Sequence, residues 1–195
     1  MKRAQFGQFL CSLAMLHAAS GIAQTLPPEI RSSSPTLALT GESKLTFFGL
    51  EIYKASLWRN ANFVADNYAQ HEFALDLNYL RNFQGKDIAK RSIEEMRRQS
   101  KLDEGLLQNW EVQMQKVFPN VQAGDNITGF HLPGKGAKFW HNGKLRGEIN
   151  DAEFAKYFFG IWLSKQTSEP KMRLALLEPK PISEKNSAIG KFYSS

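Results

Sequence analysis

The pair Asn142-Gly143 constrains the fold more than any other feature of the sequence, because it separates two extended and partly apolar runs. A two-residue Asn-Gly loop is typical of a type I′ turn, in which both residues have positive φ and join antiparallel strands. Such a turn also fixes the register of the hairpin and places Trp140 opposite Leu145. The sequence therefore predicts a β-hairpin centred on residues 142–143.

The segment after this hairpin predicts a buried helix. Asn150 is expected to cap the first N–H groups, and Glu153 completes a capping-box pattern. Apolar side chains then recur at helical spacing, at Phe154, Phe158, Ile161 and Trp162. Because Phe159 and Leu163 widen this stripe, little of the helix is polar. It is expected to lie against a sheet or against a bound apolar molecule.

Residues 1–23 are typical of a secretory signal peptide. Lys2 and Arg3 form a basic start, and the apolar run that follows ends in small residues suited to cleavage after Ala23. This run is short for a membrane span. We therefore expect a periplasmic or secreted protein, with an uncleaved membrane anchor as the alternative.

Cysteine content and charge narrow the class of protein further. The only cysteine, Cys11, lies inside the expected signal peptide, so the mature chain has no disulfide, no thiolate metal site and no cysteine nucleophile. A chain of this length can instead be held together by its apolar core. The formal net charge of +6 is small and scattered. It argues against a nucleic-acid partner and allows at most peripheral contact with an anionic membrane.

The remaining pattern predicts an α+β domain over residues 37–178. The expected elements are strands over 44–58, 73–79 and 125–132, helices over 86–100 and 107–118, and a short helix capped by Ser168. Residues 24–36 are rich in Pro and Ser and are expected to be irregular, and residues 179–195 are expected to form a mobile tail. Strands interleaved with grouped helices indicate an antiparallel sheet with a layer of helices on one face.

Residue patterns that indicate a particular chemistry are scarce. His71, His131 and His141 do not have the spacing of a zinc site, and a GxSxG nucleophile motif is missing. We therefore predict no metal, no cofactor and no catalytic set. The four Trp and fourteen Phe residues either line an apolar pocket or fill a core.

Several blocks, however, carry a resemblance to a known family. Residues 39–42 read LTGE and are followed by KLTFFGLEIYKASLW; further blocks are LDLNYL, SIEEMRR, FPNVQAG, the PGKG and HNG segments, and FFGIWLSKQTSEPKMRLALL. With these blocks, spread over about residues 37–177, the chain resembles the bacterial exported chalcone isomerase-like proteins of the chalcone isomerase superfamily. The resemblance implies an antiparallel sheet with a helical layer, and a ligand in the cleft between them.

The resemblance does not extend to the catalytic residues. Plant chalcone isomerases close a flavanone ring by attack of a phenolate on an enone, with a Thr, a Tyr, an Asn and an Arg. The Thr, Tyr and Asn positions correspond here to Phe48, Ile88 and Glu95. Ring closure needs donors aimed at the developing enolate. Phe48 and Ile88 supply none, and an ionised Glu95 would repel that charge.

We therefore predict a non-catalytic protein that binds a small lipophilic ligand, such as a fatty acid, because other members of the superfamily bind fatty acids. The candidate ligand-binding residues are Thr46, Phe48, Leu50 and Ile52 on the sheet side, and Ile88, Arg91 and Glu95 on the helix side. Arg91 is expected to face an anionic headgroup, and a solvated helix residue is the alternative interpretation.

Two other functions remain open from the sequence. The chain could be an isomerase that uses a different set of donors, for which Tyr53, Tyr79 and His131 are the candidates. It could also be an interaction protein of the cell envelope, in which the apolar face of residues 154–162 contacts a partner.

Overall fold

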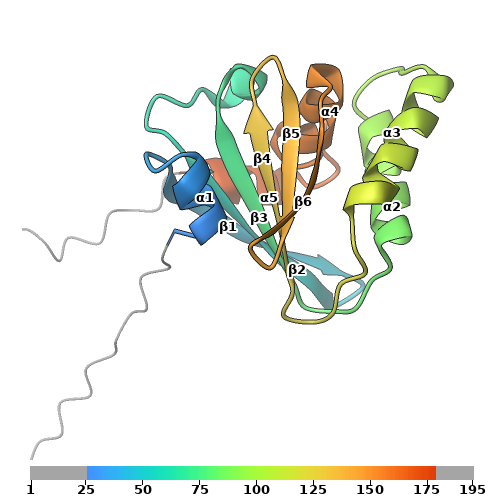
Figure 1. The fold of residues 1–195 in the computed structure, drawn as a ribbon, viewed down its shortest axis with the longest axis horizontal. Helices are drawn as coiled ribbons and strands as arrows, with labels where there is room; N and C mark the ends of the chain where they lie inside the picture. The colour runs from blue at the N-terminus through green and yellow to red at the C-terminus, as the bar shows by residue number, and fades with distance from the viewer. Residues whose placement is uncertain (1–25, 179–195) are drawn as a thin grey trace, which may run out of the picture.

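The structure is a computed structural model that describes residues 26–178 (Figure 1). The expected signal peptide of residues 1–23 and the expected tail of residues 179–195 lie outside the described residues. The centre of the fold is a six-stranded antiparallel sheet in which the strands follow one another in chain order. Its strands are β1 (Ala38–Phe47), β2 (Leu50–Arg59), β3 (Phe73–Tyr79), β4 (Asn126–Leu132), β5 (Gly136–His141) and β6 (Lys144–Ile149).

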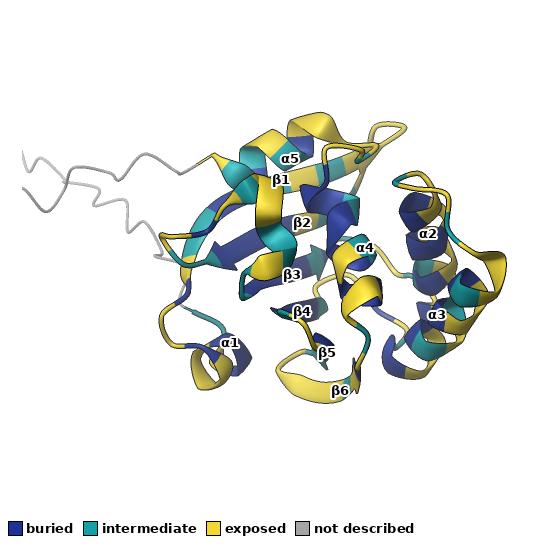
Figure 2. Cartoon of the chain, turned by 90° about the horizontal axis from the view of Figure 1, so that it is seen from above, coloured by how far each residue is buried: buried dark blue, intermediate teal, exposed yellow. Residues whose placement is uncertain are grey.

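Helices cover one face of this sheet, which confirms the expected α+β class. They are α2 (Gly85–Arg97), α3 (Glu104–Val117), α4 (Ala152–Leu163) and α5 (Pro170–Leu177). Figure 2 shows α4 between the sheet and the pair α2 and α3, with α5 beside β1. The buried apolar residues of these helices and of the facing strands form one continuous core. Among the helices of residues 26–178, none is long and apolar enough to span a bilayer.

The hairpin of β5 and β6 has the predicted turn. Asn142 and Gly143 have φ values of 48° and 76°, and Trp140 pairs with Leu145 as expected. The two strands shift register between Phe139 and Trp140, so that Phe139 pairs with Gly147. Such a bulge bends the strand and increases its twist.

The prediction of one long strand over residues 44–58 is wrong, because the chain reverses direction in the middle of this segment. Phe48 and Gly49 form a two-residue turn with φ values of 48° and 76°, and Phe47 pairs with Leu50 across it. Phenylalanine is rare at positive φ, so the residues before Gly49 gave no turn signal. The result is a hairpin of β1 and β2 in place of one strand, so Thr46, Phe48, Leu50 and Ile52 no longer form one alternating face.

The N-terminus of α4 is capped by Asp151 and not by Asn150. The Asp151 Oδ1 accepts hydrogen bonds from the backbone N–H groups of Glu153 and Phe154, both at 2.9 Å. The apolar side of α4 is buried within the chain, at Phe154, Phe158, Phe159 and Trp162. The hypothesis that this face contacts an envelope partner is therefore wrong. Likewise, Glu169 and not Ser168 occupies the N-cap position of α5.

The segment expected to be irregular over residues 24–36 contains a short helix, α1 (Pro28–Ser33), on the opposite face of the sheet. Pro28 begins it, which suits the fixed φ of proline. Ile30 packs into a second apolar cluster with Leu37, Trp58, Ala74 and Phe130. The buried Ile30 side chain thus holds α1 against the sheet. The polar sequence around Ile30 does not indicate this burial.

A polar contact also attaches α1 to the sheet. The Thr128 hydroxyl lies 2.8 Å from Oε1 of Glu29 in α1 and 2.9 Å from Oδ1 of Asp76 in β3. All three side chains are buried. Because a hydroxyl has a single proton to donate, one of the two carboxyl groups must be protonated for both contacts to be hydrogen bonds. Burial, together with the charge of Glu29, raises the pKa of Asp76 to about 6 against the hydrogen bonds from Thr128 and Asn126.

The raised pKa of Asp76 predicts a pH dependence of stability. The native state holds the Asp76 proton more tightly than the unfolded chain, so this contribution is complete below the ordinary Asp pKa and is lost as the pH rises through about 6. His131 acts in the opposite direction in the same range, because burial lowers its pKa. An Asp76→Asn variant isolates the effect. The free energy of unfolding of this variant minus that of the wild type should increase by about 2 kcal/mol between about pH 4.5 and pH 7 in urea titrations. A constant difference would contradict the assignment.

Candidate functional site

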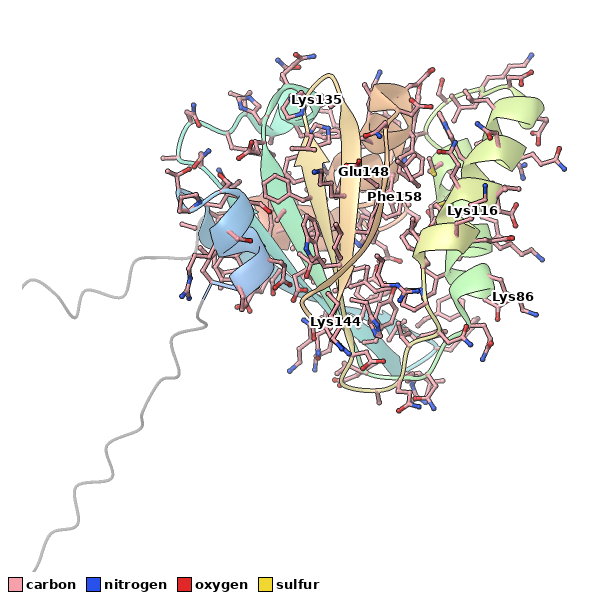
Figure 3. The ribbon with its side chains drawn as sticks, viewed as in Figure 1. Lys86, Lys116, Lys135, Lys144, Glu148 and Phe158 are labelled. Atoms are coloured by element: carbon pink, nitrogen blue, oxygen red, sulfur yellow. The ribbon has the colours of Figure 1, made fainter. Side chains whose placement is uncertain are left out.

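A cavity of about 450 Å³ lies between the sheet and the helices α2 and α4. Its walls are mostly apolar and come from the sheet, from α2, α4 and α5, and from the connections between them. The lining residues are Leu45, Phe47, Ile52, Tyr53, Leu77, Tyr79, Phe83, Asp87, Ile88, Arg91, Ser92, Glu95, Phe118, Ile127, Phe158, Ile161, Trp162, Ser168, Glu169 and Met172. Figure 3 shows Phe158, from α4, between the sheet and the pair α2 and α3. The volume is in the range of small-molecule binding sites.

The sheet side of the cavity is built by the hairpin of β1 and β2. Leu45 pairs with Tyr53, whereas the next residue, Thr46, pairs with Glu51. Ile52 is therefore an extra residue in a β-bulge. Both Ile52 and Tyr53 consequently line the cavity, although neighbouring residues of a regular strand point to opposite faces.

On the helix side, α4 and α5 contribute apolar residues, and α2 contributes one stripe of its surface. Ile88, Arg91, Ser92 and Glu95 line the cavity, and their spacing places them on one face of a helix. The adjacent stripe of Ala89, Ile93 and Met96 is buried in the core. The periodicity of the sequence therefore separates the residues that hold α2 in place from those that face the cavity.

The polar end of the cavity is formed by Arg91 and Glu95. The Arg91 Nη2 lies 2.5 Å from Oε1 of Glu95, and its Nη1 lies 3.1 Å from Oε2 of Glu94. Only 7% of the Glu95 side chain is exposed, against 57% for Arg91. The Glu95 Oε1 has no partner with hydrogen-bond geometry in the described residues, so its contact with Arg91 is an ion pair alone. The guanidinium thus stands at the rim, and a carboxylate lies below it.

A second polar group lies among the aromatic side chains. The Trp162 indole N–H donates a hydrogen bond of 3.0 Å to the Tyr53 hydroxyl oxygen. Loss of hydration raises the pKa of Tyr53, and the same effect raises that of Tyr79. Both phenols are therefore neutral at physiological pH. Because the Tyr53 oxygen accepts from Trp162, its own proton remains available to a ligand.

Four of the seven candidate residues lie in the cavity wall: Ile52, Ile88, Arg91 and Glu95. The other three, Thr46, Phe48 and Leu50, do not line it and are exposed. Their assignment assumed one continuous strand, and the turn at Phe48-Gly49 moves them to the tip and the outer face of the hairpin. Phe48, which the resemblance places at the position of the plant Thr, is therefore outside the cavity.

The donors considered for an alternative isomerase are separated by the fold. Tyr53 and Tyr79 line the cavity, and His131 does not. His131 is buried against Phe73 and Phe159, and its Nδ1 lies 2.7 Å from the His71 carbonyl oxygen. Within residues 26–178, no group of three or more His, Cys, Asp or Glu side chains is arranged to hold a metal ion.

Several residues of the cavity wall were not predicted as ligand-binding residues. Some lie on the strand face that was not chosen, and others look like ordinary core residues. Leu45, Phe47 and Tyr53 lie on the strand face opposite to the one chosen for the ligand, and of these only Tyr53 had been named, as a donor for an isomerase. Ile127 and Phe158 look like core residues in the sequence. Only the separation between α2 and the sheet turns their side chains into a cavity wall.

The structure is thus an α+β domain with a largely apolar cavity between its sheet and its helices. Residues 19–178 match the model of the chalcone isomerase-like family, and the chain belongs to this family. It is 27% identical over 137 residues to an uncharacterised protein of Haemophilus influenzae; the match covers 70% of this chain and 66% of that protein, somewhat less than two thirds of its length.

A solved structure shows the same fold. The crystal structure of a fatty-acid binding protein of Arabidopsis thaliana superposes with a TM-score of 0.56 at 12% sequence identity. The match covers 72% of this chain and 86% of the plant protein. At this level of identity the likeness establishes the fold and leaves the ligand to be argued from the cavity itself.

Proposed function

We propose that this protein binds a lipophilic small molecule with an acyl chain, without catalysing a reaction on it. The observation that carries the proposal is the cavity of about 450 Å³ between sheet and helices, with apolar walls and a single guanidinium at its rim. A long acyl chain gains about 0.8 kcal/mol for each methylene group that leaves water. The fatty-acid binding of the structurally similar plant protein supports the same class of ligand.

The headgroup of the ligand is expected at Arg91. A carboxylate would form charge-assisted hydrogen bonds with the guanidinium, but Glu95 already neutralises that group from below. A bound carboxylate and Glu95 therefore compete for Arg91. Asp87 and Glu169, which also line the cavity, add to the negative charge near the rim. Glu95 is thus expected to weaken the binding of anionic ligands.

This competition gives a paired prediction. Arg91→Gln should weaken the binding of cis-parinaric acid roughly tenfold, because one charge-assisted interaction is lost. Glu95→Gln should instead strengthen it, because the guanidinium loses its buried carboxylate partner and keeps only the exposed Glu94. The measurement is fluorescence titration of delipidated protein, with the methyl ester of the same acid as the control ligand. The ester should bind both variants with nearly the wild-type affinity. If the wild type takes up neither ligand, the proposed function is wrong.

A second candidate function rests on the Tyr53 hydroxyl. A neutral phenol with a free proton inside an apolar cavity is a suitable donor to the carbonyl oxygen of an enone. This arrangement favours an intramolecular lyase with residues other than those of the plant enzymes. Chalcone cyclisation that Tyr53→Phe slows toward the spontaneous rate would support it, and a wild-type rate equal to the spontaneous rate would exclude it.

We also propose export of the chain. The basic start and the apolar run of residues 1–23 support cleavage after Ala23. N-terminal sequencing of the protein from the periplasm or the medium should then begin at Gln24. A cytoplasmic protein with an intact N-terminus would contradict the proposal.

A further inference from the structure

The tip of the β1–β2 hairpin exposes three large apolar side chains. The exposed fractions are 56% for Phe47, 89% for Phe48 and 48% for Leu50. These residues are consecutive apart from Gly49, so they form one patch, which we call the hairpin tip. Phe48 contacts the ring of Phe47 and is otherwise open to solvent. In Figure 1 the hairpin projects at the same end of the molecule at which α2 begins.

The backbone at Phe48 makes this exposure more informative. Phe48 and Gly49 have the same φ values, 48° and 76°, as Asn142 and Gly143 in the other two-residue hairpin. Asn suits the left-handed conformation, whereas a bulky side chain is strained in it. At residue 48 the chain thus has an aromatic side chain that is unfavourable for the turn and gains little from packing. Neither the local conformation nor the core accounts for a phenylalanine at this place.

Basic side chains surround the hairpin tip. Lys44 and Lys54 pair across the hairpin on its outer face, and the Arg81 guanidinium donates a hydrogen bond to the Glu51 carbonyl oxygen at 3.1 Å. Lys86, labelled in Figure 3, lies at the start of α2. The acidic side chains near the hairpin are Glu51, paired with Lys44, and Asp87, and Glu169 also lies at the rim of the cavity. The region is therefore apolar at its end and basic at its edge.

The mouth of the cavity lies beside the hairpin tip. Phe47 belongs both to the tip and to the cavity wall. Asp87 and Arg91, which are also exposed residues of the wall, approach the same opening from α2. A surface that covers the hairpin tip would consequently face the opening through which an acyl chain enters.

We propose that the hairpin tip is a membrane-docking element that inserts Phe48 and Leu50 into the interface of an anionic phospholipid bilayer and places the cavity mouth against the lipid. Apolar side chains at the end of a loop gain free energy in the interfacial region, and neighbouring Lys and Arg side chains are attracted to anionic headgroups. Docking requires no bound ligand. Only the transfer of an acyl chain from bilayer to cavity rests on the proposed function.

The experiment is sedimentation of the protein with large vesicles of phosphatidylglycerol and phosphatidylcholine, compared with vesicles of phosphatidylcholine alone. We expect binding to the anionic vesicles that weakens at high salt, where the Debye length falls to about 3 Å. Phe48→Asn should reduce the bound fraction, with a partition coefficient roughly tenfold lower, because one aromatic side chain no longer leaves water. The same variant creates an Asn-Gly turn and should unfold at the same urea concentration as the wild type or a higher one.

The matched control is Leu145→Ser. Leu145 is a 60% exposed apolar residue close to the turn of the other hairpin, where it is the second residue after Gly143, whereas Leu50 is the first after Gly49. The Leu145→Ser variant should bind vesicles as the wild type does, whereas the Leu50→Ser variant should bind them more weakly. Equal losses for Leu145→Ser and Leu50→Ser would overturn the assignment, and so would absence of binding to anionic vesicles.

Two further measurements separate the alternatives. Light scattering that shows a wild-type dimer and a Phe48→Asn monomer would assign the hairpin tip to a second copy of the chain and overturn the proposal. Fluorescence titration with cis-parinaric acid in the absence of vesicles should give the same affinity for Phe48→Asn and for the wild type. Vesicle binding without ligand uptake would support docking while rejecting the proposed function, and the reverse result would reject docking alone.

Discussion

Replacement of Asp151 by alanine is expected to lower the free energy of unfolding by about 4 kcal/mol. The Asp151 carboxylate serves two helices at once. One oxygen caps α4 by accepting from Glu153 and Phe154, and the other accepts a hydrogen bond of 2.8 Å from the indole N–H of Trp110 in α3. Trp110 is fully buried. The substitution therefore removes a helix cap and leaves a buried donor without a partner.

The two contributions can be measured separately by urea unfolding. In a Trp110→Phe background the indole donor is already gone, so Asp151→Ala should cost only the cap, about 1–2 kcal/mol. Asn150→Ala is the matched control, because Asn150 is exposed and its replacement should change stability by less than about 0.5 kcal/mol. A larger loss for Asn150→Ala than for Asp151→Ala would show that the cap assignment is wrong.

The second large effect is expected for ligand binding. Ser92→Trp should weaken the binding of cis-parinaric acid roughly 100-fold, because an indole at this position occupies space that the acyl chain needs. Ser92 is a small buried residue of the cavity wall, in the middle of the stripe that α2 presents to the sheet. Exclusion of about four methylene groups corresponds to about 3 kcal/mol. Fluorescence titration of the delipidated variant gives the affinity directly.

The same substitution outside the cavity provides the control. Ser100 is exposed just after α2, and Ser100→Trp should leave the affinity unchanged. Ser92→Trp should also keep the wild-type urea midpoint, since the indole fills an existing space and does not displace packed side chains. Unchanged affinity of a folded Ser92→Trp protein would mean that the acyl chain binds elsewhere and would remove the basis of the proposed function.

The parts of the fold that could be predicted from the sequence are those with a strong local cause. The turn at Asn142-Gly143 needed only two residues with positive φ, and the α2 stripes needed only a period near 3.6 residues. The turn at Phe48-Gly49 could not be predicted in this way, because phenylalanine is disfavoured at positive φ and no neighbouring residue indicates a turn. Thr46, Phe48 and Leu50 were assigned to the cavity wall because the resemblance placed the plant Thr at Phe48, whereas Leu45, Phe47 and Tyr53 provide that wall.

The sequence by itself determined the α+β class, the hairpin of residues 142–143, the aromatic helix and the face of α2 that presents Arg91 and Glu95. Backbone preference and hydrophobic period act over a few residues, so they can be read locally. The tertiary structure alone decided that a cavity exists, that Asp151 joins two helices and that α1 is held by buried side chains on the far face. Each of these depends on groups far apart in the chain, and their burial and hydrogen bonds exist only after the layers have packed.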